Sequence, residues 1–379
     1  MHTGRGELDG WSYSNPVKTC FGEGRFGDLP ELIAGRPYCV VTYGEDYFLS
    51  LTDRLAASTH PAVALVSDVA PNPDFALLEN QAARFAEADP YPDVFVAIGG
   101  GSVIDTAKVL AAAGGDFSRV RRFLETKTGE EALARTAIIA VPTTAGTGSE
   151  VTSWGTVWDA ASQKKYSLNL RSLYPEYAVV DPLLMLGKSR ELTVSTGLDA
   201  LSHALESLWN VSANPVSTAF AVAAAQEILE VLPRLSEDLA SRELRARMAQ
   251  AAIMSGYAFS NTKTAIAHSI SYPITLRHHV AHGIACSFSL PIVLRSVAKD
   301  EGQGGDALRR IFGQDLEAAS ERLTEFLNNL GVSMNPADHG VNRSEWETLV
   351  DAAFDGERGQ NFSGSKEKLQ QAAKSFGIA

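Results

Sequence analysis

Short apolar runs alternate with amphipathic segments along the first half of the chain. Five of these runs are rich in β-branched residues and bounded by Gly, Pro or Asp, at residues 38–44, 62–68, 94–101, 136–144 and 177–182. Between them, residues 77–88 and 102–113 carry apolar side chains at helical spacing. Strands that are apolar along their length and separated by helices are typical of a parallel sheet covered on both faces. The pattern therefore predicts a doubly wound α/β domain.

The texture of the sequence changes after Pro182. Three long stretches are alanine-rich, with apolar positions recurring at helical spacing and few β-branched runs: residues 195–209, 214–235 and 244–259. This pattern predicts that the second half is mostly helical. We place the boundary so that residues 1–185 form the α/β domain and residues 186–379 form the helical domain.

Composition narrows the kinds of partner. The length of 379 residues fits two domains, and the formal net charge of -12 disfavours nucleic acid and membrane surfaces, because both require a cationic face. The cysteines Cys20, Cys39 and Cys286 show no metal-binding or redox spacing, which leaves ordinary buried thiols as the interpretation. We find no apolar signal core and no uninterrupted apolar run that spans a bilayer. These features predict a soluble, cytoplasmic protein.

Three glycines, Gly99, Gly100 and Gly101, stand between a predicted buried strand and the predicted helix that follows. Glycine lets a backbone approach a ligand closely, and the N-terminus of a helix offers free N–H groups to a pyrophosphate. The motif GGGS is not the GxGxxG fingerprint, so an ordinary strand-to-helix turn remains an alternative.

A second glycine-rich loop, residues 141–152, also follows a predicted strand. It carries hydroxyl groups around Gly146 and Gly148, at Thr143, Thr144, Thr147 and Ser149. Two such strand exits in one parallel sheet predict a groove for an elongated phosphate ligand. The alternative is a surface loop that is merely rich in small residues.

Asp199 and His203 are four residues apart in a strongly helical stretch, so both lie on one helical face. Such a pair is more often a surface hydrogen bond, and a lone histidine in apolar sequence, such as His268, is usually a satisfied core residue. His282 adds a third imidazole. One aspartate and three histidines would form a mixed nitrogen and oxygen site for a divalent metal such as Fe²⁺ or Zn²⁺.

The motifs GGGSVIDTAK, PTTAGTGSEVT, GLDALSHALE and HGIACSFSLP stand in the order found in the iron-dependent (group III) alcohol dehydrogenases, which the chain resembles over nearly its whole length. The resemblance implies a dehydroquinate synthase-like architecture, in which an α/β dinucleotide-binding domain and an all-α domain enclose the active site. It implies that Asp199, His203, His268 and His282 are the metal ligands.

The same resemblance implies which residues bind the cofactor, NAD or NADP. They are Gly99, Gly100, Gly101, Ser102 and Asp105 in the first loop, Thr143, Thr144, Thr147 and Ser149 in the second, and Lys165 beside the nicotinamide. The implied reaction is hydride transfer between this cofactor and a small alcohol or aldehyde, with the metal as a Lewis acid.

Two positions depart from the family pattern. Tyr272 stands where many members carry a histidine near the substrate; we expect it either to donate a hydrogen bond there or only to pack. Tyr43 stands where many NAD-dependent members carry an aspartate that binds the ribose, with Glu45 and Asp46 just beyond. The nearby acids slightly favour NAD over NADP.

The stretches WSYSNPVKTCFGEG and HSISYPITLR resemble family members found with phosphonate metabolism, which implies a phosphonoacetaldehyde-like substrate. Such an anion requires a local cation, and the candidates are Arg171, Arg277, His278 and His279. Two other activities remain open: an NAD- and metal-dependent lyase similar to dehydroquinate synthase, and a metal-free reductase of the maleylacetate type. We expect a homodimer or a larger homo-oligomer.

Overall fold

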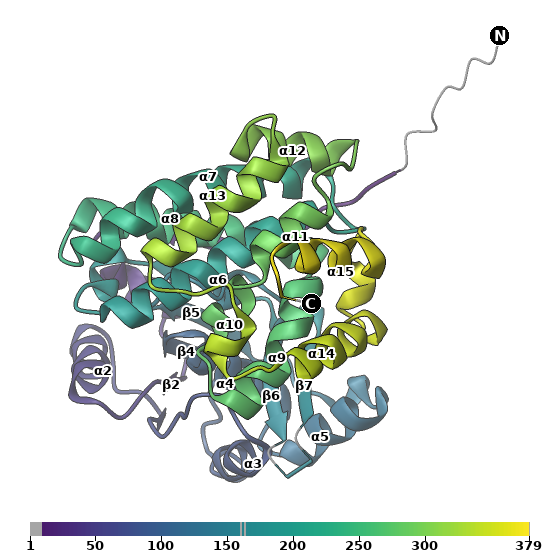
Figure 1. Cartoon of the computed structure of the whole chain (residues 1–379). Helices are drawn as coiled ribbons and strands as arrows, with labels where there is room; N and C mark the ends of the chain where they lie inside the picture. Colours follow the sequence, from purple (N-terminus) through teal and green to yellow (C-terminus); the bar gives the residue numbers. More distant parts are fainter. Residues whose placement is uncertain (1–9, 160, 163, 379) are drawn as a thin grey trace.

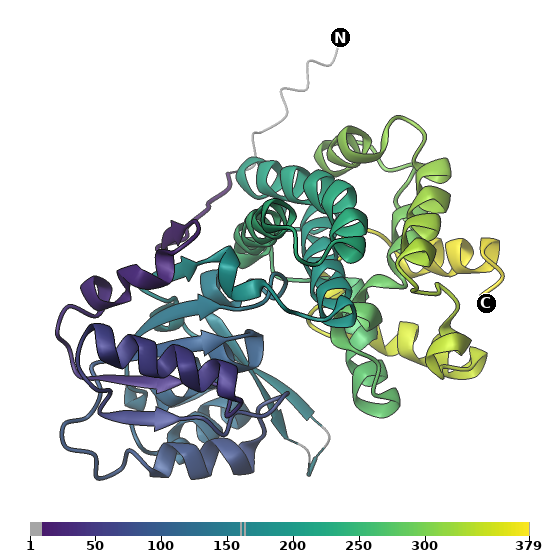
Figure 2. The same ribbon diagram turned by 90° about the vertical axis from the view of Figure 1, so that its left-hand side faces the viewer.

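The computed structural model describes residues 10–159, 161–162 and 164–378. Its first half is an α/β layer structure and its second half is a set of helices. These two halves lie side by side as two lobes (Figures 1 and 2). The last strand of the sheet ends at Val180 and the first long helix of the second lobe begins at Arg190. The predicted fold class is confirmed.

The first lobe is built on a six-stranded sheet in the order β1-β8-β5-β4-β2-β3, with all neighbouring strands parallel. The strands are β1 (Lys18–Phe21), β2 (Tyr38–Val41), β3 (Ala64–Val66), β4 (Val94–Gly99), β5 (Ala137–Pro142) and β8 (Tyr177–Val180). All except β1 lie within the predicted apolar runs. The strand order reverses between β2 and β4, and ligands of open α/β sheets bind at such a point, outside the carboxyl ends of the strands.

Helices cover both faces of this sheet, which explains why its central strands are apolar throughout. The helices are α1 (Leu29–Ile33), α2 (Asp46–Ser58), α3 (Phe75–Ala83), α4 (Gly101–Ala113) and α5 (Phe117–Thr126). Along β4, Phe95 packs with the core beneath α3 to α5, whereas Val96 packs with the core beneath α1 and α2. The predicted helix 77–88 begins earlier, as α3, because the side chain of Asp74 caps it by accepting a hydrogen bond from Ala76 N at 2.9 Å.

An antiparallel hairpin that the sequence analysis did not predict leaves the sheet after β5. It consists of β6 (Trp154–Asp159) and β7 (Lys164–Asn169), and it packs on α4. Gly155 makes this contact close, since a Cβ there would lie 3.1 Å from Asp105 O. The hairpin pairs Trp158 with Lys165 and so carries Lys165 toward the second lobe.

The second lobe is helical, as predicted. Its helices are α6 (Arg190–Leu208), α7 (Pro215–Glu237), α8 (Arg242–Thr262), α9 (Ile266–His278), α10 (His282–Ser287), α11 (Leu290–Ser296), α12 (Gln303–Phe312), α13 (Leu316–Asn329), α14 (Arg343–Asp355) and α15 (Lys366–Ser375). Helix α6 is central, with α7, α8 and α10 packed around it, and most of its residues are buried. Ser189, Asn214 and Ser241 cap α6, α7 and α8, because their side chains accept hydrogen bonds from the first turns.

Helix α7 is long and apolar enough to cross a membrane by length and composition alone. Polar residues such as Gln226 and Glu227 interrupt it, so it is not the uninterrupted apolar run that the sequence lacks. Ala221, Ala225 and Ile228 of α7 are fully buried in the core shared with α6 and α8. The core helix of a soluble protein passes the same test, so the apolar character of α7 is explained by this packing.

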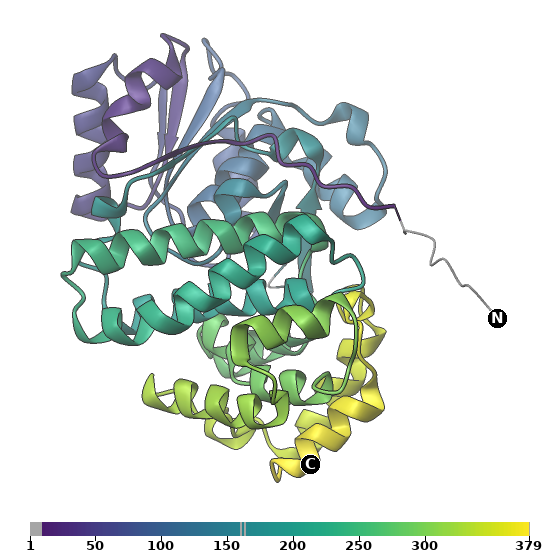
Figure 3. The ribbon, with the colours of Figure 1, turned by 90° about the horizontal axis from the view of Figure 1, so that it is seen from above.

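The segment of residues 10–17 runs along the border between the two lobes before the first strand begins (Figure 3). Tyr13 donates a hydrogen bond from its hydroxyl to Tyr257 O on α8 at 3.1 Å. The amide of Asn15 donates to Val151 O at 2.9 Å and to Ser260 Oγ at 3.2 Å. The segment therefore ties the second glycine-rich loop to α8 and stabilises the arrangement of the two lobes.

Candidate active site

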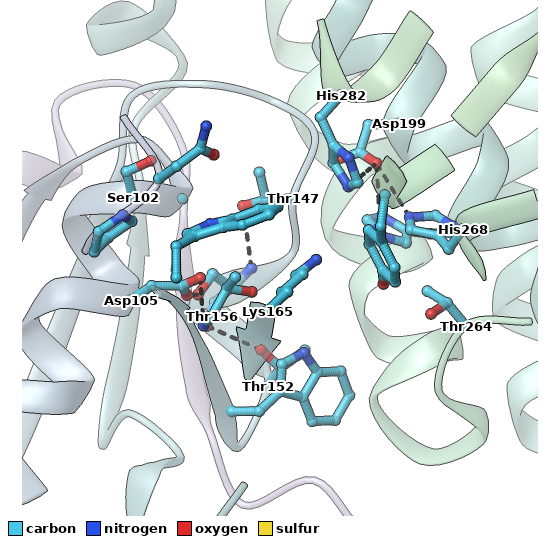
Figure 4. A pocket seen from close by; sticks show the side chains of 18 of the residues that line it. Ser102, Asp105, Thr147, Thr152, Thr156, Lys165, Asp199, Thr264, His268 and His282 are labelled. Carbon is cyan, nitrogen blue, oxygen red and sulfur yellow. Dashed lines mark hydrogen bonds and ion pairs between the residues drawn. The ribbon is translucent and has the colours of Figure 1, made fainter. Parts of the chain in front are cut away.

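One cavity lies between the two lobes, and most of the predicted site residues line it (Figure 4). From the first lobe these are Gly101, Ser102, Asp105, Thr147, Ser149 and Lys165, and from the second they are Asp199, His203, His268, Tyr272 and His282. The glycine-rich loops form one wall and the aspartate–histidine cluster forms the other, while Lys165 points into the space between them.

The first loop brings the backbone close to this cavity. Strand β4 ends at Gly99 and helix α4 begins at Gly101, directly at the strand-order reversal. A Cβ on Gly101 would lie 2.8 Å from Thr147 Cγ2, so a side chain there would push the two loops apart. The first N–H groups of α4 have no partner within the helix and lie at its positive end. This loop is suited to a pyrophosphate.

The remaining predicted loop residues shape the loops from behind and do not line this cavity. Thr143 is buried, and its N–H donates to Gly99 O at 3.0 Å, which joins the two strand exits. Thr144 Oγ1 lies 3.4 Å from the position that a Cβ on Gly100 would occupy. Both contacts hold the first loop in its extended approach to the cavity.

Asp105, predicted to contact the cofactor, is engaged inside the protein. Its Oδ1 accepts a hydrogen bond from Ser149 Oγ at 2.5 Å, and its Oδ2 accepts one from Thr156 N at 2.9 Å. Asp105 therefore ties α4 to both the second loop and the hairpin while it lines the cavity.

Lys108, one turn further along α4, was missed by the sequence analysis, since a lysine in a helix usually points to solvent. The side chain is fully buried, and Nζ donates to Ser149 O at 2.7 Å, Trp154 O at 2.8 Å and Thr152 Oγ1 at 3.2 Å. Burial lowers its pKa to about 8. Asp105 and Lys108 together hold the second loop against α4.

The aspartate–histidine cluster assembles around one carboxylate oxygen from three helices. Asp199 Oδ1 lies 3.7 Å from His203 Nε2 on the same helix, 3.4 Å from His268 Nε2 on α9 and 3.9 Å from His282 Nε2 on α10. A Cβ on Gly283 would lie 1.8 Å from Ser195 O, so only glycine lets α10 approach α6 closely enough.

This cluster fits a divalent metal ion. Ligands of a tetrahedral ion at about 2.1 Å stand about 3.4 Å from one another, which is close to the observed separations. Asp199 Oδ1 and His268 Nε2 are buried and have no hydrogen-bond partner in the described part of the chain. Burial lowers the pKa of His203 to about 4 and that of His282 to about 3, so both are neutral at pH 7. Neutral imidazoles are the form that binds metal.

The carboxylate of the cluster is ionised. Burial alone would raise the pKa of Asp199, but its electrostatic interactions with the surrounding imidazoles, the hydrogen bond from His268 among them, outweigh burial and hold the pKa well below its usual range. An anionic oxygen ligand is therefore present at neutral pH, as a divalent ion requires.

Glu206 supports the cluster from behind and was also missed. It is fully buried on α6 and accepts hydrogen bonds from Ala265 N at 3.0 Å, from Ala267 N at 2.6 Å and from His268 Nδ1 at 2.6 Å. A carboxylate on Nδ1 turns Nε2 of the same ring toward the metal position. The available signal was spacing, because Glu206 follows His203 by three residues on the helix.

Cys286 is a free, buried thiol, as expected, and it also lies against the cluster. A ligand atom from each of Asp199, His268, His282 and Cys286 lies within 4.8 Å of the others. Sγ of Cys286 is 3.6 Å from His282 Nε2. Burial raises the pKa of the thiol, so the weaker, protonated ligand form prevails at pH 7. His203 and Cys286 are thus two alternatives for the fourth ligand.

Tyr272 stands between the cluster and Lys165. Its ring stacks on His282 with centroids 5.9 Å apart, and Lys165 Nζ lies 3.6 Å from its centre. Burial alone would raise the pKa of Tyr272, but the charges of Arg358 and Lys165 outweigh it and lower the pKa. Burial also lowers the pKa of Lys165.

The cations predicted to face the substrate lie elsewhere, and that expectation was wrong. His278 Nε2 lies 3.0 Å from Glu345 Oε1, and Arg277 Nη1 lies 3.6 Å from the same oxygen. His279 is exposed at the end of α9, and Arg171 does not line the cavity. The sequence could not relate these side chains to α14, which is distant in the chain.

Tyr43 follows β2 at the edge of the first loop. Its hydroxyl lies 3.9 Å from the position that a Cβ on Gly100 would occupy. Burial raises the pKa of this phenol, which is therefore neutral at pH 7. Tyr43 lies where β2 and β4 diverge, at the site expected for a ribose.

Both parts of the chain match models of known proteins. Residues 16–182 match the model described as iron-containing alcohol dehydrogenase, and residues 193–374 match the C-terminal model of the Fe-containing alcohol dehydrogenase family. An NAD-dependent methanol dehydrogenase of Bacillus methanolicus is 35% identical over 272 residues, which are 69% of this chain and 71% of the relative.

Two further relatives are named as reductases of aldehydes that carry an acidic group. A phosphonoacetaldehyde reductase of Streptomyces viridochromogenes is 35% identical over 259 residues, 64% of this chain and 66% of the relative. The crystal structure of a sulfoacetaldehyde reductase from Bifidobacterium kashiwanohense in complex with NAD+ superposes with a TM-score of 0.87 at 27% identity, covering 99% of both chains.

Proposed function

The chain belongs to the iron-containing alcohol dehydrogenase family, and from this premise we propose that it transfers hydride between NAD(H) and a short aldehyde or primary alcohol. The observation that carries the proposal is the shared cavity, in which the aspartate–histidine cluster faces the two glycine-rich loops. A hydride acceptor and its donor require such a common, enclosed space.

The residues of the cavity have different roles. Asp199, His203, His268 and His282 hold the metal, and a divalent ion held there supplies Lewis-acid polarisation of the substrate oxygen. The ring of Phe259 lies parallel to that of His203 at 4.0 Å, so it shields this side of the cluster from water. We propose Fe²⁺ as the resident ion, with Zn²⁺ as the alternative that the same donors accept.

The glycine-rich loops bind the dinucleotide. The N-terminus of α4 receives the pyrophosphate, and Ser102 and Thr147 offer hydroxyl groups to it. Lys165 and Tyr272 form the wall next to the cluster, where the nicotinamide and the substrate meet. These side chains orient the two reactants and reduce the volume open to water.

NAD(H) is the proposed coenzyme in preference to NADP(H). Tyr43 follows β2, and the acidic residues Glu45 and Asp46 come next, at the start of α2. Their carboxylates repel a 2′-phosphate at this position. A ratio of kcat/KM that favours NADPH over NADH would contradict this assignment.

The substrate is proposed to be a small aldehyde, and anionic aldehydes are the first to test. Two relatives are named for phosphonoacetaldehyde and sulfoacetaldehyde. We propose phosphonate metabolism as the setting of this reaction, since one relative is named for phosphonoacetaldehyde. We further propose that the protein works in the cytoplasm. We also propose that it forms a homodimer or larger homo-oligomer, and light scattering of the purified protein tests this oligomeric state.

Metal-stripped protein tests the proposal directly. Fe²⁺ or Zn²⁺ is added back, and NADH oxidation is followed at about 340 nm with propionaldehyde, sulfoacetaldehyde and phosphonoacetaldehyde. We expect oxidation that depends on both metal and aldehyde. The absence of metal-dependent oxidation with every aldehyde contradicts the proposed function. Product formation without net NADH consumption would favour a lyase.

A further inference from the structure

Arg358 brings a positive charge to the cavity between the lobes. It lines the cavity beside the cluster, and its guanidinium lies 5.6 Å from the centre of the Tyr272 ring. Nη1 donates a hydrogen bond to Thr264 Oγ1. Within the described part of the chain, Arg358 forms no ion pair; its neighbour Glu357 pairs with Lys263 at 3.2 Å.

The loop that carries Arg358 is held firmly. Asn361 donates from its side-chain amide to Thr264 O at 2.9 Å, so one residue of the second lobe anchors the loop at two points. A Cβ on Gly359 would lie 1.9 Å from Ala353 O, and only glycine allows this close turn. The guanidinium is therefore placed before a ligand arrives, which reduces the entropic cost of binding.

Lys165 supplies a second cation on the same ring. Its Nζ lies 3.6 Å from the centre of Tyr272, and it too forms no ion pair among the described residues. Burial lowers its pKa, which is the expected consequence of keeping a charge away from both water and a counter-ion. Two unpaired cations around one aromatic ring are costly unless an anion joins them.

The cationic region extends outward from the active-site cavity. A second cavity shares Trp154, Lys165, Tyr272 and Arg358 with the first. Lys127 and Lys263 also line it, together with Glu357, which pairs with Lys263 and leaves the cations in excess. Because the chain as a whole carries a net charge of -12, a local cationic passage is needed to attract a small anion to the site.

We propose that Arg358, with Lys165, forms a subsite for the anionic group of the substrate, a sulfonate or phosphonate whose aldehyde end lies at the aspartate–histidine cluster. This inference rests on the proposed function of the same cavity. The planar guanidinium matches two oxygens of such a group, whereas Lys165 adds a point charge from the opposite lobe. The subsite makes Arg358 a residue that determines specificity.

The test compares kcat/KM for sulfoacetaldehyde, phosphonoacetaldehyde and propionaldehyde in the metal-loaded enzyme. Arg358→Gln is expected to lose roughly 10- to 100-fold with the two anionic aldehydes and to change little with propionaldehyde, as the loss of a charge-assisted hydrogen bond predicts. Arg358→Lys should recover part of the loss. Arg277→Gln is the matched control, because it removes a guanidinium outside the cavity.

A second measurement does not depend on turnover. Isethionate, the alcohol that corresponds to sulfoacetaldehyde, should raise the melting temperature of the wild-type protein and of Arg277→Gln, but not that of Arg358→Gln. An equal loss with charged and neutral aldehydes, or undiminished stabilisation of Arg358→Gln by isethionate, overturns the subsite. Failure of the wild-type enzyme with propionaldehyde as well as with the anionic aldehydes contradicts the proposed function instead.

Discussion

Nδ1 of His268 donates to Oε2 of Glu206 across 2.6 Å, and both side chains are buried. Together with the N–H of Ala267, which also donates to Glu206, this contact joins the start of α9 to α6, and it selects the tautomer of the imidazole. Nε2 of the same ring is left 3.4 Å from Asp199 Oδ1, on the side where the ligands converge. The geometry of the metal cluster is therefore set by a residue that does not reach the metal.

Replacing Glu206 with Gln is expected to weaken metal binding by about 10- to 100-fold, because the imidazole loses its charged acceptor. Retention of Fe²⁺ or Zn²⁺ against a competing chelator measures the effect. Glu191→Gln, an exposed carboxyl in the first turn of the same helix, is the control. Unchanged metal affinity in Glu206→Gln would show that His268 is oriented by packing alone.

The fourth metal ligand is expected to be His203 and not Cys286. Co²⁺ substitution distinguishes them, since a bound thiolate gives an intense near-ultraviolet charge-transfer band and an imidazole does not. We expect no such band in the wild-type protein, normal Co²⁺ binding in Cys286→Ser and weakened binding in His203→Ala. A strong band that disappears in Cys286→Ser would assign the ligand to the cysteine.

The sequence predicted those elements of the fold that have a clear local pattern of apolar residues. The run at 94–101 is buried on both faces, so its apolar character alone predicted β4. The strand β1 lies at the sheet edge and is largely half-exposed, so it lacks an apolar run and is defined only by its pairing with β8. The strands of the hairpin β6–β7 contain lysines and other polar residues, so their sequence lacks a clear alternation of apolar and polar residues.

The candidate site shows the same division. Asp199 and His203 are related by helical spacing, which a sequence displays directly. Arg358 and Lys108 act through contacts with residues distant in the chain or through burial within a helix, and neither leaves a periodic signal. The candidates for the substrate-facing cation were therefore sought at Arg277 and three other residues of the sequence, whereas we propose Arg358, which lines the cavity from the loop before Gly359.

Lys108 is expected to position the second glycine-rich loop without touching the reactants. Lys108→Met leaves several oxygens of that loop without a donor, which costs about 1–3 kcal/mol for each buried group. We expect KM for NADH to rise about tenfold or more, with metal content unchanged and kcat affected less. Lys299→Met, at an exposed surface lysine, is the control. Loss of metal in step with the change in KM would instead indicate general unfolding.

Glu150, next to Ser149 in the second loop, makes stability depend on pH. Burial raises its pKa from 4.5 to about 7, so the folded state binds this proton more tightly than the unfolded state does. The resulting stabilisation is complete below pH 4.5 and is lost as the pH rises through 7. The amide side chain of Glu150→Gln cannot ionise. The free energy of unfolding of this variant, relative to that of the wild type, should therefore be higher at pH 7.5 than at pH 5 by on the order of 1–3 kcal/mol. Urea unfolding at both pH values measures this, with Glu191→Gln as the control; a difference that is the same at both would contradict the shift.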